Sequence, residues 1–248
     1  MKTLVQKIES TLSVKHTPSL HEKELFERTQ LFVRLISWIP GIRMIAVSNS
    51  LAMHATHPNS DIDLFIITSV NRLWIVRAGI LAMAIMLNVR TRPGNEAGKF
   101  CFPFFMTEKN LSLKKIAIEN DIYLAYWIRT LKPLYNIDYT YGRFMEVNKA
   151  WYEEILEEFS SPANHQEHLN SNRMFLIEKN KHAFSILIWK WVSPLLWLLD
   201  RWLSIISKKI IFKRIHTTDQ EGVIVNDDMI KIHTPDKRRE IREKALMS

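Results

Sequence analysis

The alternation of apolar and polar positions predicts two core strands joined by a turn and a short helix. Residues 43–47 form a mainly apolar run, residues 48–50 supply a polar turn, and residues 51–53 can begin a helix. Residues 61–67 then alternate with a period of two, which is the period of side chains along a strand. We therefore expect the order strand, turn, short helix, loop, strand in this part of the chain.

Two carboxylates, Asp61 and Asp63, open the second of these strands. Because the side-chain period is two, both should project from the same face of the strand. Two like charges a few ångströms apart repel each other, so this placement requires a compensating cation. Mg²⁺, or Mn²⁺, is the simplest choice, since such ions prefer oxygen ligands and leave positions for phosphate oxygens.

Helical spacing of apolar residues predicts helices on both sides of this unit. Residues 1–37 should form two helices separated at residues 15–18. Asn71 can cap a further helix over residues 72–88, which is apolar nearly all round and should be buried against the sheet.

The middle of the chain predicts a third strand and more helices. Residues 99–107 are rich in aromatic residues, and Pro103 within them indicates an edge position or a bulge. A helix is expected over residues 111–132, ended by Pro133, and an amphipathic helix over residues 144–155.

The last third of the chain begins with a polar stretch, residues 160–172, whose composition is that of a linker. A helical part should follow and be kinked or split at Pro194. Residues 223–232 predict a small hairpin, and a basic helix over residues 237–246 should close the chain.

Composition narrows the classes of partner. The chain has 248 residues, 47% of them hydrophobic, and a net charge of +8, which favours a nucleoside triphosphate, a nucleic acid or an acidic membrane surface. Cys101 is the single cysteine, so an intrachain disulfide is excluded and a reducing, cytoplasmic location is expected. Lying in an apolar run without a nearby partner in sequence, Cys101 is expected to be a buried packing residue.

Two apolar segments bear on membrane association. Residues 73–89 are interrupted by Arg77, and residues 184–212 carry four tryptophans but several charges. Neither offers about 18 uninterrupted apolar residues, so no spanning helix is expected. No signal peptide is expected either, because residues 1–9 carry charges throughout and no long apolar stretch. The segment Trp189–Trp202 could pack on the core or make a peripheral contact with a membrane surface.

The stretch 43–68 resembles the signature of the DNA polymerase beta-like nucleotidyltransferase superfamily. That signature is a hydrophobic strand, a Gly-Ser turn, a spacer and an Asp-hydrophobic-Asp strand. Ser50 matches the serine, and Asp61 and Asp63 match the paired metal ligands. Asn49 stands where the glycine is expected, and asparagine tolerates the left-handed backbone better than other side-chain-bearing residues.

A weaker resemblance to a poorly characterised microbial group of this superfamily extends over about residues 30–160. It implies an α/β (α+β) fold, with helices packed on a small mixed nucleotidyltransferase-like sheet. This domain, with its N-terminal helices, should occupy residues 1–160, and residues 173–248 should form a helical C-terminal region with the hairpin.

The resemblance also implies an activity: metal-dependent transfer of a nucleoside monophosphate from a nucleoside triphosphate to an acceptor hydroxyl. Asp61 and Asp63 would hold Mg²⁺ or Mn²⁺ and act in catalysis. The triphosphate would be bound by the turn and by a serine beside the carboxylates: Ser48, Asn49, Ser50 and Ser60. The acceptor, whether a small molecule, RNA or protein, is not indicated.

Members of the superfamily usually add a third carboxylate from a later strand. The aromatic strand contains no acid, so Glu108, which follows it, is the first choice, with Glu96, Glu119 and Asp121 as others. Without a third carboxylate, the alternative is a catalytically degenerate nucleotide- or RNA-binding module on the same scaffold. A third hypothesis is a peripheral membrane protein that uses the tryptophan-rich segment.

Other polar residues near the signature have two interpretations. His54 and His57 lack further partners for a zinc site and should face solvent, or contact phosphate. Arg90, Arg92 and Lys99 form a basic cluster that could neutralise a triphosphate or an acidic acceptor, or be a solvated loop.

Overall fold

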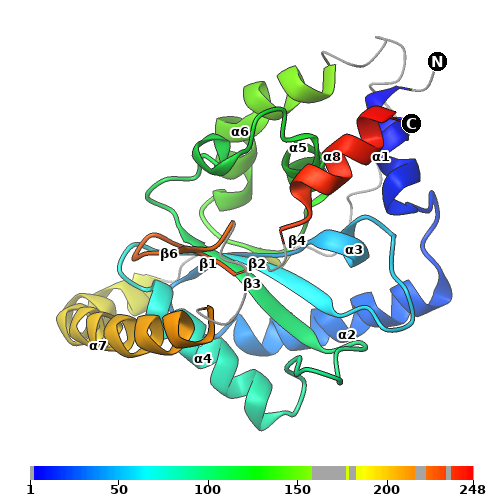
Figure 1. The fold of residues 1–248 in the computed structure, drawn as a ribbon. Coiled ribbons are helices and arrows are strands. Elements are labelled where there is room, and N and C mark those ends of the chain that lie inside the picture. Colours follow the sequence, from blue (N-terminus) through cyan, green and yellow to red (C-terminus); the bar gives the residue numbers. More distant parts are fainter. Residues whose placement is uncertain (1–2, 158–176, 179–182, 216–221, 233–235, 248) are drawn as a thin grey trace.

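The fold is a mixed sheet with helices on both faces, which confirms the expected α/β class (Figure 1). The structure is a computed structural model that describes residues 3–157, 177–178, 183–215, 222–232 and 236–247. Along the helix that begins at Ala183, side chains are described from Ser193 to Lys213.

The described strands form one sheet in the order β5-β4-β1-β2-β3-β7-β6. Their bounds are β1 (Ile42–Val47), β2 (Ile62–Thr68), β3 (Phe100–Thr107), β4 (Lys132–Asn136), β5 (Ile177–Glu178), β6 (Ile224–Val225) and β7 (Met229–Lys231). The β2–β3 and β4–β5 pairs are parallel, and the other pairs are antiparallel. The predicted hairpin is confirmed as β6–β7, and it extends the main sheet through β3.

The helices form two layers. Their bounds are α1 (Leu4–Leu12), α2 (Leu20–Ile36), α3 (Asn49–Ala52), α4 (Leu73–Met86), α5 (Ile122–Thr130), α6 (Thr140–Glu157), α7 (Ala183–Ile215) and α8 (Arg238–Met247), with a 3₁₀ turn at Lys114–Ile116. Figure 1 shows α2, α4 and α7 on one face of the sheet, and α1, α5, α6 and α8 on the other.

Each face of the sheet carries its own hydrophobic core, and β2 contributes to both. Ile62, Leu64 and Ile66 pack in the core beneath α2 and α4, whereas Phe65 and Ile67 pack in the core of α5 and α6. This is the alternation expected of a strand buried on both faces. Asp63 and Asp61 precede Phe65 by two and four residues. Their carboxylates therefore lie on the same face of the sheet as Phe65, the face covered by α5.

The two N-terminal helices begin at capping boxes, as a Ser or Thr followed three residues later by Gln or Glu predicts. At the start of α2, the Ser19 hydroxyl accepts from the Glu22 N–H at 3.2 Å, and the Glu22 carboxylate accepts from the Ser19 N–H at 2.8 Å. Fully buried Glu22 also accepts from the Thr56 hydroxyl at 2.8 Å. This second contact ties α2 to the loop between α3 and β2.

The prediction of one long helix over residues 111–132 is wrong. This part of the chain instead forms the 3₁₀ turn, the helix α5 and the strand β4. Asp121 is the N-cap of α5. Pro133 lies inside β4, where the register with β1 shifts between Ile45 and Ala46. Such an irregularity accommodates a residue that has no backbone N–H to donate.

The structure also refines details of the predicted helices and strands. The N-cap of α4 is Arg72, not Asn71, which has a left-handed φ of 59°. The helix is buried against the sheet as expected, although its last turn leaves Ile85 and Met86 exposed. Pro103 marks a bulge, as one alternative predicted, and not an edge, because β3 pairs with β2 on one side and β7 on the other.

The C-terminal part joins the same sheet and cores. β7 pairs with β3, α7 packs on α4, and α8 packs on α1 and α5. Pro194 lies inside α7, so the helix is not split there. The linker expected over residues 160–172 lies outside the described residues. In the part of the chain that is described, none of the helices combines the length and apolar character needed to cross a membrane.

Candidate metal and phosphate site

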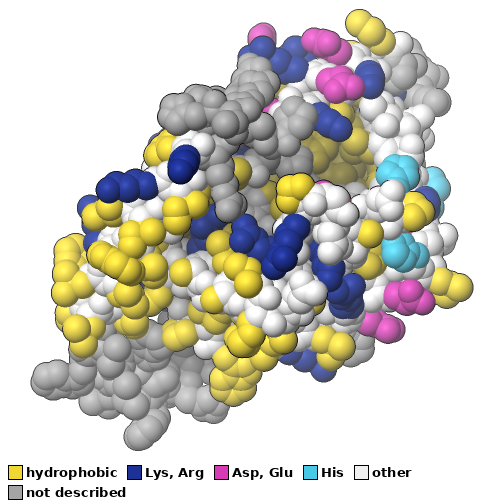
Figure 2. Space-filling view, turned by 60° about the horizontal axis from the view of Figure 1, so that its bottom comes forward, with side chains coloured by type: hydrophobic (Ala, Val, Ile, Leu, Met, Phe, Trp, Pro, Cys, Tyr) yellow, Lys and Arg dark blue, Asp and Glu magenta, His cyan; other side chains and the backbone are white. Residues whose placement is uncertain are grey.

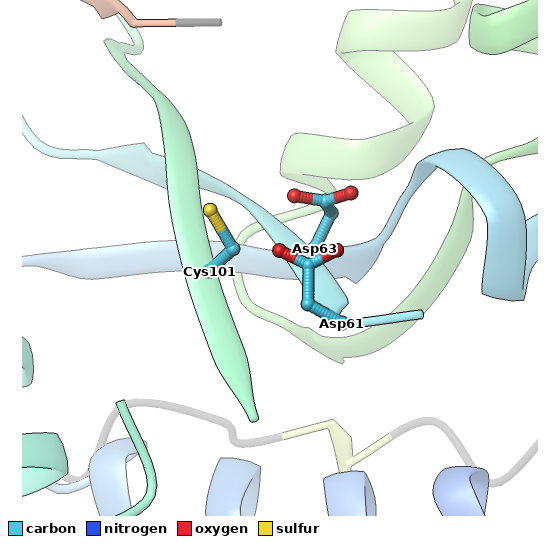
Figure 3. A group of neighbouring side chains, drawn as sticks. All are labelled: Asp61, Asp63 and Cys101. Carbon is cyan, nitrogen blue, oxygen red and sulfur yellow. The ribbon is translucent and has the colours of Figure 1, made fainter. Parts of the chain in front are cut away.

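Asp61, Asp63 and Cys101 converge where β2 and β3 begin (Figure 3). The register pairs Asp63 with Cys101 across the parallel strands. A carboxylate oxygen of each aspartate and the thiol sulfur all lie within 4.8 Å of one another. The prediction that both aspartates project from one face is confirmed, and the neighbouring strand adds a third possible ligand atom to them.

The turn after β1 holds one of these carboxylates in place. Asn49 has a φ of 52°, the left-handed conformation that its replacement of glycine requires. Its side-chain amide donates to Asp63 Oδ2 at 2.7 Å, and its amide oxygen accepts from Trp127 Nε1 at 2.8 Å and Tyr123 Oη at 3.2 Å. Asn49 thus connects the turn and α5 to the carboxylate.

Burial sets the electrostatics of the cluster. Asp63 is 6% exposed, and this burial raises its pKa to about 6, although the hydrogen bond from Asn49 acts in the opposite direction. Burial, with the charges of Asp63 and Asp61 next in importance, raises the pKa of the Cys101 thiol well above its usual range. The thiol therefore stays protonated at neutral pH beside two carboxylates.

The cluster fits a divalent cation. Two converging carboxylates, one of them buried and costly to ionise, are stabilised by a positive charge between them. Carboxylate oxygens are the ligands of Mg²⁺ and Mn²⁺, whereas a protonated thiol is a weak donor. The set therefore favours a hard ion held mainly by Asp61 and Asp63, with its remaining positions filled by water or substrate oxygens.

Glu108 is not part of this site. Cys101 and Glu108 lie at opposite ends of β3, which at about 3.3 Å per residue separates them by roughly 20 Å. Glu108 instead accepts from Arg43 Nε and Arg143 Nη2, each at 3.1 Å. The prediction of Glu108 as the third carboxylate is wrong. Because β2 and β3 run parallel, both strands begin beside Asp61 and Asp63, and Glu108 follows β3 at the opposite end.

The other candidate acids also lie outside the group, which among the described residues contains two carboxylates and one thiol. Asp121 caps α5 and binds Arg238 at 2.7 Å. Glu96 accepts from the Gly94 N–H in an exposed turn, and Glu119 is exposed.

The serines of the predicted phosphate site differ in their surroundings. Ser48 is buried, and its N–H and hydroxyl donate to the Asp63 carbonyl at 3.0 and 3.3 Å. Ser50 is half-buried in the first turn of α3, and its carbonyl accepts from Ala55. Ser60 shapes the loop before β2 through its hydroxyl, which accepts from the His57 N–H at 2.8 Å.

Two cavities flank the cluster. One of about 110 Å³ adjoins Asn49 and is lined by aromatic and basic side chains, among them Tyr123, Trp127, Lys231 and Lys237. The other, of about 180 Å³, reaches Cys101 and is lined by Arg77 and Arg90 together with apolar residues. Both volumes are smaller than the ~300 Å³ at which pockets for small molecules usually begin, so a ligand of that size would extend beyond either cavity.

The three residues of the predicted basic cluster, Arg90, Arg92 and Lys99, do not lie together at the candidate site. Arg90 lines the cavity beside Cys101. Lys99 Nζ donates to the carbonyl of Asn88 at 2.6 Å, and Arg92 is exposed in a turn that pairs with Asn95. Only Arg90 of the three therefore adjoins the candidate site.

His54 does not face solvent, as was expected, but joins a buried polar network. Its Nε2 lies 2.5 Å from Lys132 Nζ, and its Nδ1 lies 3.9 Å from the Glu22 carboxylate. Burial, followed by the charge of Lys132, lowers the pKa of His54 to about 4, and burial lowers the pKa of Lys132 to about 8. His57 is exposed in the loop before β2.

This network predicts that stability falls as the solution becomes acidic. The pKa of His54 is lower in the folded than in the unfolded chain, so its contribution is complete above about pH 6.5 and is lost as the pH falls toward 4. Between pH 7 and pH 5 the loss should be about 2 kcal/mol. Urea unfolding at several pH values should show this loss of stability. His54→Asn should abolish the pH dependence, because asparagine does not titrate, and it suits the site because it also accepts a left-handed φ.

His57→Asn is the matched control and should leave the pH dependence unchanged. Glu22, Lys15 and Lys132 also face His54, so the difference between the two variants isolates the histidine. Equal pH profiles for His54→Asn and the wild type would contradict the assignment.

Cys101 is the site residue that sequence reasoning missed. It was expected only to pack, because no partner lies near it in the sequence. Its side chain instead contacts Asp63 and Thr91. The signal that could have found it is position: apart from the thioether of Met106, the Cys101 sulfur is the only side-chain atom of residues 100–106 that can be a metal ligand.

Comparisons with known proteins do not place the chain in a family. No protein-family model matches the sequence, and no curated protein matches it significantly.

Proposed function

We propose that this protein is a metal-dependent nucleotidyltransferase that moves a nucleoside monophosphate from a nucleoside triphosphate to an acceptor hydroxyl. The observation that carries the proposal is the convergence of Asp61 and Asp63 on one face of β2, with Asp63 held by Asn49 of the turn. The same turn-and-strand arrangement underlies the resemblance of residues 43–68 to the polymerase beta-like signature.

The surroundings of the carboxylates support phosphate chemistry. The cavity beside Asn49 is lined by the aromatic residues Tyr123 and Trp127, by exposed Lys237, and by Lys231, which is paired with Asp236 at 3.3 Å. Aromatic faces suit a nucleobase, and cations suit phosphate oxygens. On the other side of the cluster, Arg77 and Arg90 make the cavity at Cys101 attractive to an anionic group.

The reaction would be an in-line displacement at the α-phosphorus. The acceptor oxygen forms a bond to that phosphorus, the bond to the bridging oxygen breaks, and pyrophosphate leaves while the acceptor hydroxyl gives its proton to water. Asp61 and Asp63 would hold Mg²⁺ or Mn²⁺, which when bound stabilises charge on the attacking and leaving oxygens. Asn49 would keep the Asp63 carboxylate oriented toward the ion through its 2.7 Å hydrogen bond.

The direct test is incubation with each α-labelled nucleoside triphosphate and Mg²⁺ or Mn²⁺, with wild type compared with Asp61→Ala/Asp63→Ala. We expect the wild type alone to give an acceptor that carries the label and to release unlabelled pyrophosphate. Release that persists in the double variant would contradict the assignment of the site.

A catalytically degenerate binding module is the second candidate, and a specific observation favours it. Cys101 lies on the strand beside β2, opposite Asp63, where a third carboxylate would complete the set of ligands. A protonated thiol there weakens the site for a hard ion. This candidate predicts metal-dependent binding of nucleotide without turnover.

Cys101→Asp should therefore strengthen metal binding. A third carboxylate beside Asp61 and Asp63 should raise the affinity for Mn²⁺ about tenfold, or 1.4 kcal/mol, because it adds a charged oxygen ligand. Titration calorimetry would measure it, with Cys101→Ser as the neutral control. An aspartate variant that binds Mn²⁺ no better than the serine variant would show that residue 101 is not at a ligand position.

A further inference from the structure

Helix α7 has an inner face that is well fixed to the fold. Arg72 Nη2 donates to the Ser193 hydroxyl at 2.9 Å, and the Ile75 N–H donates to the Asp200 carboxylate at 2.8 Å. Asp200 and Ser204 are buried on this face. These contacts anchor one side of α7 on α4. They therefore also fix which side chains of α7 lie on the opposite, outward side.

The opposite face of α7 is a stripe of exposed apolar side chains. Leu195 is 68% exposed, Leu198 57%, Leu199 41%, Trp202 60% and Ile205 58%. At about 100° per residue, these positions project within an arc of about 120° on the side away from Asp200. Figure 2 shows hydrophobic side chains gathered over α7. Five large apolar side chains exposed on one face of a helix indicate a binding face.

The two tryptophans described on α7 do not pack in the core. Trp197 is 44% exposed and Trp202 60%. Of the two alternatives for the tryptophan-rich segment, packing on the core is therefore wrong for this pair. The side chains of Trp189 and Trp191 lie outside the described residues. Exposed tryptophan, with an apolar ring and one polar N–H, suits the boundary between lipid headgroups and acyl chains.

The charges on α7 are almost all positive. Arg201 and Lys208 are paired with Asp227 at 2.8 and 2.7 Å, whereas Lys209 and Lys213 are exposed on the helix. Between Ser193 and Lys213 the single acidic residue is Asp200, which faces inward. The exposed side of the helix therefore combines an apolar stripe with cations, and the whole chain adds a net charge of +8.

We propose that α7 docks on an anionic membrane surface, lying parallel to it with the Leu195–Ile205 stripe at the headgroup and acyl-chain boundary. Lipid phosphates would pair with Lys209 and Lys213, which follow the stripe along the helix. A helix face on which an apolar stripe is followed by two exposed lysines fits a fluid anionic surface, as amphipathic interfacial helices do. Ile211 of α7 also lines the cavity at Cys101, so docking would bring the membrane close to the candidate site.

Co-sedimentation of the full chain with vesicles tests the proposal, and needs no nucleotide, so its outcome is independent of the proposed enzymatic function. The probes are vesicles of phosphatidylcholine alone and vesicles in which about 30% is phosphatidylglycerol. We expect the wild type to bind the anionic vesicles, and Leu198→Glu/Trp202→Glu to lower its partition coefficient at least about tenfold. Lys209→Glu/Lys213→Glu should lower binding to the anionic vesicles alone, by about tenfold.

Leu31→Glu/Trp38→Glu is the matched control, since it replaces an exposed leucine and an exposed tryptophan elsewhere on the surface. It should bind as the wild type does, and circular dichroism should show all variants folded. Absence of binding to the anionic vesicles, or equal binding by the stripe variant, would overturn the proposal. A wild-type dimer that the stripe variant converts to a monomer would overturn it too, by assigning the stripe to a second copy of the chain.

Discussion

Asp63→Asn is expected to lower the rate of the proposed nucleotidyl transfer by about a thousandfold, because it removes a ligand of the ion that supplies several kcal/mol of transition-state stabilisation. The same change should stabilise the fold in the presence of a chelator. Burial raises the pKa of Asp63 to about 6, so keeping its carboxylate charged at pH 7 costs about 3 kcal/mol. Asparagine has nearly the same shape as aspartate but no charge, so the variant does not bear this cost of a buried charge.

The two readouts together separate a functional role from a structural one. Activity would be measured by pyrophosphate release, and stability by urea unfolding in EDTA at pH 7. Glu153→Gln, a partly exposed acid on α6 that lies 3.9 Å from Lys149, is the control and should change neither. A variant with unchanged turnover would contradict the proposed site, and one that is strongly destabilised would show that Asp63 is held for structure.

Arg238→Met is expected to destabilise the fold by about 3–5 kcal/mol, because it leaves a buried carboxylate without its cation. Arg238 is 8% exposed and Asp121 is fully buried. The guanidinium donates to Asp121 Oδ2 and to Asp236 Oδ2, each at 2.7 Å, and to the Ile116 carbonyl at 2.9 Å. These contacts attach α8 to the start of α5.

Urea unfolding would measure the loss, and Lys237→Met, an exposed neighbour, should cost little. Asp121→Asn/Arg238→Met should cost less than the sum of its two single changes, since each alone leaves a partner unpaired. A loss below about 1 kcal/mol in Arg238→Met would mean that water replaces the guanidinium at Asp121.

Local pattern was sufficient for the unit around the candidate site. The alternation of residues 61–67 required Asp61 and Asp63 to share a face, and Asn49 does adopt the left-handed conformation. Both statements depend only on backbone geometry within a few residues. For the same reason the hairpin β6–β7 and the helix α8 could be predicted.

Strand β4 could not be predicted in this way. Lys132–Asn136 is short, contains Pro133 and follows a helix directly, so its local pattern favoured the end of that helix. It is a strand because β1 offers it an edge for pairing, and that edge is supplied by residues far away in sequence.

The sequence by itself determined the two carboxylates, their common face and the turn that precedes them, because periods and turn conformations act over neighbouring residues. Tertiary structure alone decided their surroundings. The parallel pairing of β2 with β3 brings Cys101 opposite Asp63 and carries Glu108 to the far edge of the sheet. The anchoring of α7 through Asp200 likewise decides that Trp202 is exposed. Strand register and helix orientation depend on contacts between distant segments, which a local pattern does not contain.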